Sequence, residues 1–303
     1  MGAMSARHPA PFDAFVAPAR ARPQLWRLAL GLVLVVGIHM GLSLALVAGL
    51  SRLTGPDALR AETLGSTPGV MLLLLVSFGG LVLGLWVALR LLHRRGLRSL
   101  IGHGPTALRH FAAGAGLILT VNGLALGAAL LMTPAGSELA PVPNLAPAIW
   151  LTWLPLALIG LAVQTGAEEL VFRGYMQQQL AARFAHPLIW AGLPSIAFGL
   201  LHHDPATMGA NTWPVVALTA LFGLIVADLT ARSGTLGLAW GLHFANNFFA
   251  LLLVAPAGAL SGLALWTAPF SPDDTGAMRL VLLADVVLLG LIWALCRAAL
   301  RRG

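Results

Sequence analysis

The chain has 303 residues, of which 58% are hydrophobic and only 10% are charged, and its mean hydropathy is +0.85. Soluble globular proteins carry about 25% charged residues, so this chain lacks the polar side chains that a water-facing surface requires. The composition excludes a soluble globular protein and a disordered chain. It predicts an all-α fold, a polytopic bundle of transmembrane helices.

The apolar segments have lengths suited to a bilayer, which needs about 20 residues per helical span. We expect eight spans, at residues 25–48, 70–92, 111–131, 149–184, 188–202, 215–229, 236–254 and 280–300. The chain then divides into a flexible cytoplasmic N-terminal arm (1–24), N-terminal transmembrane helices (25–140), a helical core with most of the unusual polar residues (141–254), and a loop with the last transmembrane helix (255–303).

The positive charge comes from arginine alone, because the net charge is +7 and the chain contains no lysine. Most arginines lie just outside apolar segments, and no basic stripe is interleaved with aromatic residues, so the charge indicates membrane topology rather than nucleic-acid binding. With the N-terminus inside, fourteen arginines fall on the inner side and three, Arg52, Arg60 and Arg279, on the outer side. We therefore expect both termini in the cytoplasm and a multi-pass protein of a bacterial inner membrane.

Ionisable and amide side chains cluster within the spans of the helical core. Such groups are costly in a membrane and indicate functional sites. They lie in the sequences AEELVFRG, FGLLHH and HFANN, and their central residues are Glu168, Glu169, Arg173, His202, His243 and Asn247.

Spacing predicts different roles for the two adjacent glutamates. Glu169 and Arg173 are four residues apart, so they share one face of a helix and are expected to form an ion pair. Glu168 lies about 100° around the helix from Glu169. It has no obvious cation of its own, which suits it to act as a general base. We expect a structural role for Glu169 and a chemical role for Glu168.

Helix geometry predicts that the three clusters reach similar depths. If the chain turns at His186–Pro187 on the inner side, Glu168 and His202 each lie roughly 23–27 Å from that turn, at about 1.5 Å per residue. The seventh span starts on the same side and carries His243 and Asn247 about 14 and 20 Å inward, on one helix face. The predicted intramembrane cavity is therefore lined by Glu168, His202, His243 and Asn247.

Each cluster also has a structural interpretation. Thr165 and Glu168 fit a helix capping box, the Glu169–Arg173 pair can be purely structural, and a histidine in a span can simply bond a neighbouring helix. Four further polar residues are expected to be isolated: His39, Asn122, Asp228 and Asp285. Two others neighbour a motif residue but point to another helix face: His203 and Asn246.

The motifs resemble those of a known family. EELVFRG matches the pattern EExxxR, FGLLH matches FxxxH and HFANN matches HxxxN. In this order and on separate spans, they resemble the CPBP family of intramembrane proteases, which includes the Rce1-type CAAX prenyl endopeptidases and bacterial relatives. The resemblance covers roughly residues 149–254 and implies an endopeptidase that cuts a membrane-associated protein or peptide. It implies that Glu168 and His202 activate the attacking water. His243 and Asn247 would then stabilise the oxyanion, and Glu169 and Arg173 would hold the site together.

The resemblance leaves the cofactor open. The family is described as metalloproteases, and Glu168, His202 and His243 would suffice as three Zn²⁺ ligands with an open fourth position. No HExxH motif is present, and a metal-free water activated by glutamate fits the same residues. Zn²⁺ catalysis and metal-free catalysis are therefore alternatives.

Two other functional classes use polar residues in spans. A non-catalytic scaffold of the same fold, such as an immunity or partner-binding protein, need not keep both glutamates and both histidines. A transporter or proton relay also uses intramembrane Glu and His, but the sequence has no detectable repeat or paired interrupted helices. The favoured partners are the lipid bilayer and a membrane protein or peptide substrate, with no nucleic acid; the motifs predict no particular oligomeric state.

Overall fold

The structure, a computed structural model, describes residues 9–54, 64–134, 137–138 and 140–302, so Arg7 and Arg60 of the charge argument lie outside it. Most of this chain is helical, because a helix satisfies its backbone hydrogen bonds internally and can therefore cross lipid. The N-terminal helices are α1 (Ala10–Val16), η1 (Ala17–Ala19), α2 (Leu25–Thr54), α3 (Pro68–Ser77), α4 (Gly79–Ala88), η3 (Leu89–His93), η4 (Leu97–Leu100) and α5 (Gly104–Met132). The later helices are α6 (Pro147–Glu169), η5 (Leu170–Met176), α7 (Gln177–Arg183), η6 (Leu188–Gly192), α8 (Leu193–Leu200), α9 (Pro205–Met208), η7 (Gly209–Asn211), α10 (Thr212–Ser233), α11 (Gly237–Asn247), η8 (Phe248–Leu253) and α12 (Thr275–Arg302).

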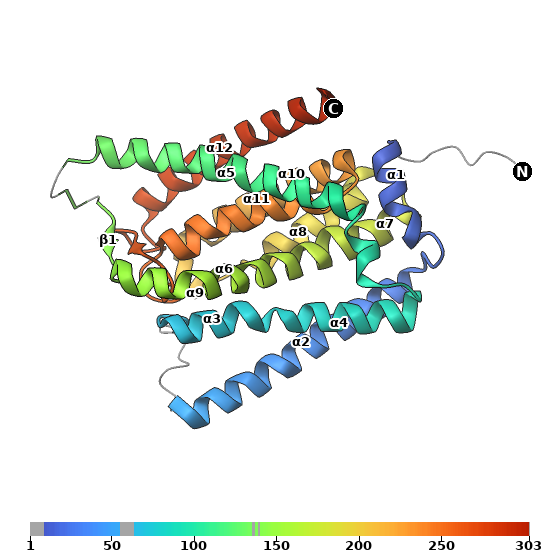
Figure 1. Ribbon diagram of the computed structural model, residues 1–303, viewed down its shortest axis with the longest axis horizontal. Coiled ribbons are helices and arrows are strands. Elements are labelled where there is room, and N and C mark those ends of the chain that lie inside the picture. Colours follow the sequence, from blue (N-terminus) through green and yellow to red (C-terminus); the bar gives the residue numbers. More distant parts are fainter. Residues whose placement is uncertain (1–8, 55–63, 135–136, 139, 303) are drawn as a thin grey trace, which may run out of the picture.

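All eight expected apolar segments are helical, but they differ in length. Within the described residues, six helices are long and apolar enough to cross a bilayer: Leu25–Arg52, Pro68–His93, Gly104–Met132, Pro147–Arg183, Pro205–Ser233 and Thr275–Arg301. The other two, Leu188–Leu200 and Gly237–Leu253, have only 10–17 residues, less than the roughly 30 Å hydrocarbon core requires at 1.5 Å per residue. These shorter helices contain α8 and α11, which lie in the middle of the bundle (Figure 1).

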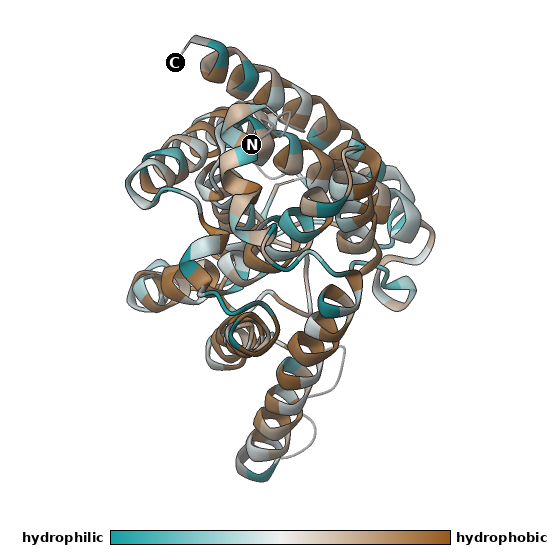
Figure 2. Cartoon of the chain, turned by 90° about the vertical axis from the view of Figure 1, so that its right-hand side faces the viewer, coloured by the Kyte–Doolittle hydropathy of each residue, from teal (hydrophilic) through white to brown (hydrophobic). Residues whose placement is uncertain are grey.

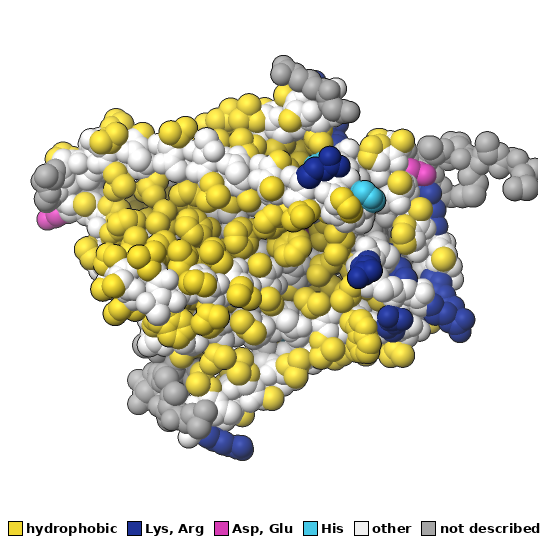
Figure 3. Space-filling model, in the orientation of Figure 1, with side chains coloured by type: hydrophobic (Ala, Val, Ile, Leu, Met, Phe, Trp, Pro, Cys, Tyr) yellow, Lys and Arg dark blue, Asp and Glu magenta, His cyan; other side chains and the backbone are white. Residues whose placement is uncertain are grey.

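The outside of the bundle is apolar, as a surface in contact with lipid should be. Leu131 is 90% exposed, and leucines and valines cover the outer faces of the long helices. Figure 2 shows this apolar character along the helices seen from one end, and Figure 3 shows it across a broad face. Arginines gather mainly at one end of that face, where α1 and the C-terminal end of α12 also lie. The chain is an integral, multi-pass membrane protein, and both ends of the described chain lie on the arginine-rich side.

Three two-residue strands join the loops at the opposite end of the bundle. β1 (Val142–Pro143) pairs antiparallel with β3 (Trp266–Thr267), which pairs parallel with β2 (Val254–Ala255). This small sheet holds the start of α6, which carries the glutamates, near the end of η8, which continues from α11 and its His243.

The start of the chain corrects the expectation of a flexible arm over residues 1–24. Residues 1–8 lie outside the described chain, but α1 is a helix whose Phe12, Phe15 and Val16 are buried. Their spacing of three and one residues places them on one helix face. The ring of Phe12 lies 4.6 Å from that of Trp190, centroid to centroid. Hydrophobic burial therefore holds α1 against the bundle.

Glycines let α11 pack closely against α5. A Cβ atom at Gly237 or Gly241 would overlap the carbonyl oxygen of Ala107 or Phe111, and one at Gly114 would lie 2.7 Å from the Leu238 oxygen. Helices in lipid associate through such small residues, which bring the backbones into contact. This contact positions the face of α11 that follows Gly241.

Candidate active site

The predicted ion pair lies at the junction of α6 and the π-helix η5. Arg173 Nη1 lies 3.0 Å from Glu169 Oε1, and the two side chains are 2% and 0% exposed. The Arg173 guanidinium also lies 4.5 Å from the ring centroid of Phe198, a cation–π contact. The expected pairing of Glu169 with Arg173 is confirmed. A π-helical turn such as η5 is frequent at functional sites.

His243 joins the two glutamates across the interface between α6 and α11. Its Nδ1 lies 2.8 Å from Glu169 Oε1, and its Nε2 lies 3.5 Å from Glu168 Oε2. The ring is 4% exposed. Since an ionised carboxylate only accepts hydrogen bonds, His243 Nδ1 donates to Glu169 and Nε2 is directed at Glu168. Glu168, which the sequence left without a cation, therefore has an imidazole beside it.

Gln164 is a member of the site that the motifs did not reveal. Its Nε2 donates to Glu168 Oε2 at 2.8 Å, and its Oε1 accepts from Asn247 Nδ2 at 3.1 Å. One amide thus joins the glutamate of α6 to the asparagine of α11. Its place four residues before Glu168, on the same helix face, was the available signal. We call the connected set the acid–imidazole network; its members are Gln164, Glu168, Glu169, Arg173, His243 and Asn247.

The capping-box interpretation of Glu168 is wrong. Thr165 lies inside α6, where its hydroxyl donates to the Leu161 carbonyl and accepts from Trp240 Nε1. The helix has begun long before this residue, at Pro147. The carboxylate of Glu168 therefore has no helix start to cap.

His202 follows the end of α8 and reaches the site from a second direction. Its Nδ1 lies 2.9 Å from the Phe198 carbonyl oxygen. Because a carbonyl oxygen can only accept, Nδ1 carries the proton and Nε2 is left as an acceptor. The ring of Phe198 lies 5.1 Å from that of His202 and 5.8 Å from that of His243. Within the described chain, His202 makes no hydrogen bond to Glu168, and the ring of Phe198 contacts both imidazoles.

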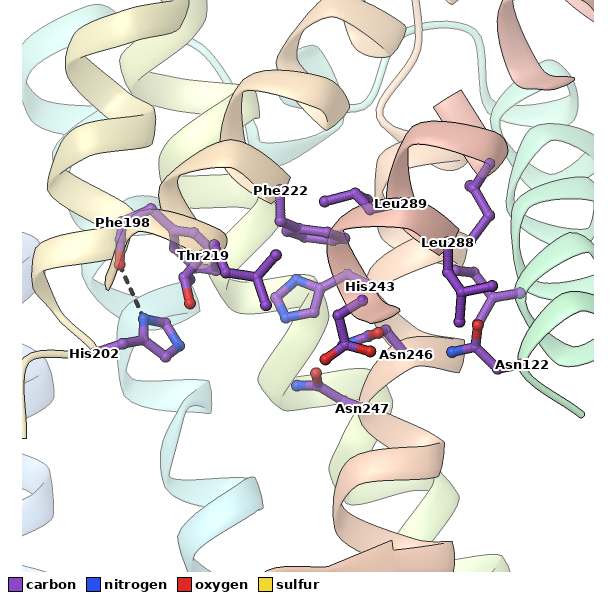
Figure 4. Close-up of a pocket in the computed structure, with 14 residues that line it drawn as sticks. Asn122, Phe198, His202, Thr219, Phe222, His243, Asn246, Asn247, Leu288 and Leu289 are labelled. Carbon is purple, nitrogen blue, oxygen red and sulfur yellow. Dashed lines mark hydrogen bonds between the residues drawn. The ribbon is translucent and has the colours of Figure 1, made fainter. Parts of the chain in front are cut away.

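A cavity of about 220 Å³ opens in front of these residues. Figure 4 shows His202 at one side of it and Asn122 at the other, with His243, Asn246 and Asn247 between them. The cavity is lined by Ile118, Asn122, Phe198, His202, Leu218, Thr219, Phe222, His243, Asn246, Asn247, Asp285, Leu288, Leu289 and Ile292. Three of the four predicted catalytic residues line it, and Glu168, whose side chain is 13% exposed, adjoins it through His243.

The isolated polar residues divide into two groups. Contrary to the prediction, Asp228 is not isolated but pairs with Arg232 and accepts from Trp293. The ring of His39 lies against that of Phe78, and the ring of His203 packs on Trp213, both away from the cavity. Asn122 and Asp285 correct the expectation of isolation, because both line the cavity together with Asn246. Asn122 and Asp285 are 163 positions apart, and no local spacing connects them.

The predicted Zn²⁺ ligands do not form a metal-binding group. Among the described residues, no three His, Cys, Asp or Glu side chains are placed so that they could hold a metal ion. His243 directs one nitrogen to each glutamate, and His202 directs Nδ1 to a backbone carbonyl. This arrangement does not fit Glu168, His202 and His243 as a shared ligand set.

The fold and the site define a polytopic helical membrane protein with an acid–imidazole network beside an internal cavity. Residues 148–249 match the family described as type II CAAX prenyl endopeptidase Rce1-like. This segment of the chain is therefore similar to the Rce1-like family, whose members are generally peptidases. The match spans α6 to η8, including every member of the network.

One similar curated protein is the uncharacterized protein YyaK of Bacillus subtilis (strain 168). It is 31% identical over 115 residues, which are 38% of this chain and 38% of that protein. The alignment thus spans well under half of the relative's length. No solved structure matches the chain.

Proposed function

We propose that the protein is an intramembrane endopeptidase that hydrolyses a peptide bond of a membrane-associated protein or peptide. The observation that carries this proposal is the orientation of His243, which Glu169 holds at Nδ1 so that Nε2 lies 3.5 Å from Glu168. His202 and Asn247 line the adjoining cavity. An acid, two imidazoles and an amide around one cavity supply the proton transfer and charge stabilisation that amide hydrolysis needs. The Rce1-like domain supports the same class of reaction.

Glu168 and His202 activate the attacking water in this proposal. Glu168 accepts a proton from the water, whose oxygen bonds to the peptide carbonyl carbon. The free Nε2 of His202 accepts a hydrogen bond from the second O–H and orients the water. The C–N bond then breaks, and the amine nitrogen receives the proton that Glu168 took. Both products leave without a covalent bond to the protein.

His243 and Asn247 stabilise the oxyanion. Asn247 Nδ2 has two N–H groups, of which one is used by Gln164, so the second is available to the developing negative charge. His243 donates from Nε2 when its ring carries both protons. A single such donor is worth about 10²–10³ in rate. Glu169 and Arg173 act as positioning residues, because they fix the His243 ring.

The test is cleavage in proteoliposomes by wild type, Glu168→Gln and Glu138→Gln. Each protein is mixed with membrane proteins of the native host, and new peptide termini are identified by mass spectrometry. Glu168→Gln keeps the size of the side chain but removes the base, and we expect cleavage to fall by about 10²–10⁴-fold. Glu138→Gln makes the same change on an exposed loop side chain and should cleave like wild type.

Two results would contradict the proposal. Identical termini with wild type and Glu168→Gln, both folded by thermal melting, would favour a non-catalytic scaffold and direct the work to a partner search. Activity that a chelator removes and stoichiometric Zn²⁺ restores would replace the metal-free mechanism with a metal-dependent one.

A further inference from the structure

Polar groups from three further helix positions line the same cavity as His202 and His243. Asn122 comes from α5, Asn246 from α11 and Asp285 from α12. We call these three residues the polar wall. None of them belongs to the acid–imidazole network, and the proposed mechanism uses none of them.

The polar wall has hydrogen-bonding capacity that the protein leaves unused. Asp285 has no hydrogen bond or ion pair within the described part of the chain, whereas each of the other described aspartates accepts at least one hydrogen bond. The Oδ1 atom of Asn122 is buried and has no partner among the described residues. A buried acceptor without a partner, such as Asn122 Oδ1, costs about 1–3 kcal/mol. Asp285 is exposed, and its carboxylate lines the same cavity without a partner. Together the two groups indicate a ligand.

The missing partner is a donor, and a positively charged one fits best. The neighbours of Asp285 one turn away on α12, Val281, Leu282, Leu288 and Leu289, are all apolar. Farther along the helix, Arg297 lies over the ring of Trp293, and neither it nor Arg279 lines the cavity. Carboxylates inside membrane bundles face cavities and pair with cations. Ammonium and guanidinium groups are pure donors and complement a carboxylate and two amide oxygens.

Two of the three polar-wall residues also lie outside the matched segment. Asn122 and Asp285 lie outside residues 148–249, the segment that matches the Rce1-like family. The helices that flank the matched segment therefore add further polar groups to the cavity that holds the residues proposed to act on the peptide bond.

We propose that the polar wall is a specificity subsite that binds a positively charged side chain, lysine or arginine, of the substrate. This inference rests on the proposed function, because it assigns the cavity to a peptide. Asp285 supplies the countercharge, and Asn122 and Asn246 supply amide oxygens. A substrate bound there carries its cation a short distance from the bond that the acid–imidazole network attacks.

Binding and cleavage of defined peptides test this subsite separately. The probes are synthetic single-span Leu/Ala peptides in nanodiscs, each with one lysine, norleucine or glutamate at a scanned position. Binding is measured by fluorescence anisotropy with the Glu168→Gln protein, which binds without cutting. We expect the lysine peptide to bind about tenfold or more tightly than the norleucine peptide at one position. Adding Asp285→Asn should abolish that difference, and Asp285→Arg should favour the glutamate peptide.

The matched control is Asp228→Asn in the same background. Asp228 is a second aspartate that contacts α12, through Trp293, but it does not line the cavity. It should leave the preference for lysine unchanged. A preference that persists in Asp285→Asn, or no preference for lysine at any position, would overturn the subsite.

Cleavage of the same peptides by wild type separates the two proposals. A lysine preference in binding together with no cleavage would support the subsite and count against the endopeptidase. Cleavage that ignores the charge of the scanned residue would support the endopeptidase and overturn the subsite. If both hold, Asp285→Asn lowers kcat/KM for the lysine peptide by about tenfold and leaves the norleucine peptide unchanged.

Discussion

The acid–imidazole network and the polar wall differ in how their polar groups are satisfied. In the acid–imidazole network, His243 contacts both glutamates and Gln164 bonds both Glu168 and Asn247. On the polar wall, neither Asp285 nor the Oδ1 atom of Asn122 has a partner within the described chain. Connected polar groups hold one another rigidly, whereas unpartnered ones stay available to a ligand. Mutations should therefore have large effects on stability in the network and small effects on the polar wall.

The largest effect on stability should come from Arg173→Leu. The change leaves the carboxylate of Glu169 buried without its cation, which costs about 3–5 kcal/mol in free energy of unfolding. Unfolding in mixed detergent micelles measures this loss. Arg232→Leu is the control, because it breaks an i,i+4 pair of the same kind whose side chains are 38% and 33% exposed; we expect about 0–1 kcal/mol. Equal losses would show that the buried pair has no special role.

Gly241→Ala should be the next most damaging. The added Cβ overlaps the carbonyl oxygen of Phe111, so α5 and α11 must separate and the ring of His243 must shift. We expect a loss of about 1–3 kcal/mol, with lower cleavage per folded molecule. Gly127→Ala on α5 meets nothing within 4 Å and should retain both stability and cleavage. A neutral Gly241→Ala would mean that this helix contact does not position His243.

Gln164→Leu tests the link between Glu168 and Asn247. Two hydrogen bonds disappear and leave both partners unpaired, which should cost about 1–2 kcal/mol of stability. If Gln164 is a positioning residue, kcat falls by about tenfold while KM changes little. Gln177→Leu is the control, since it removes a buried amide that bonds the Ala227 carbonyl away from the cavity. It should lose comparable stability without a change in kcat.

Asp285→Asn should have the smallest effect on stability. A side chain without a partner has little to lose, so we expect a change within about 0.5 kcal/mol. Asp228→Asn, which weakens contacts to Arg232 and Trp293, should lose about 1 kcal/mol. A loss of about 3 kcal/mol for Asp285→Asn would reveal a structural partner and remove the contrast between the network and the polar wall.

Local features were predictable from the chain. Composition and apolar length indicated a polytopic helical bundle, and arginine placement indicated that both ends share one side. The pairing of Glu169 with Arg173 follows from four-residue spacing on a helix. Gln164 lies four residues before Glu168 and follows the same spacing rule, but it was not predicted as a site residue because it carries no charge.

Contacts between distant segments were not predictable in this way. Helix geometry predicted the depth of His243 in the membrane but not its partners. Its contacts with both glutamates depend on how closely α11 approaches α6. The packing of α1 against the bundle was not predictable from the sequence. The helix is only seven residues long, and the segment around it is rich in proline and arginine. The lengths of the two short helices likewise depended on where the chain turns.

The order of residues along the chain thus encodes the membrane class, the helices, the orientation and the three motifs, because hydropathy and helical spacing act over one or two turns. The pairing of His243 with Glu168, and the meeting of Asn122 with Asp285 on one cavity, arise only when helices far apart in the chain pack together. Side-chain contacts across helix interfaces depend on helix rotation and separation, which small residues such as Gly241 set at each interface.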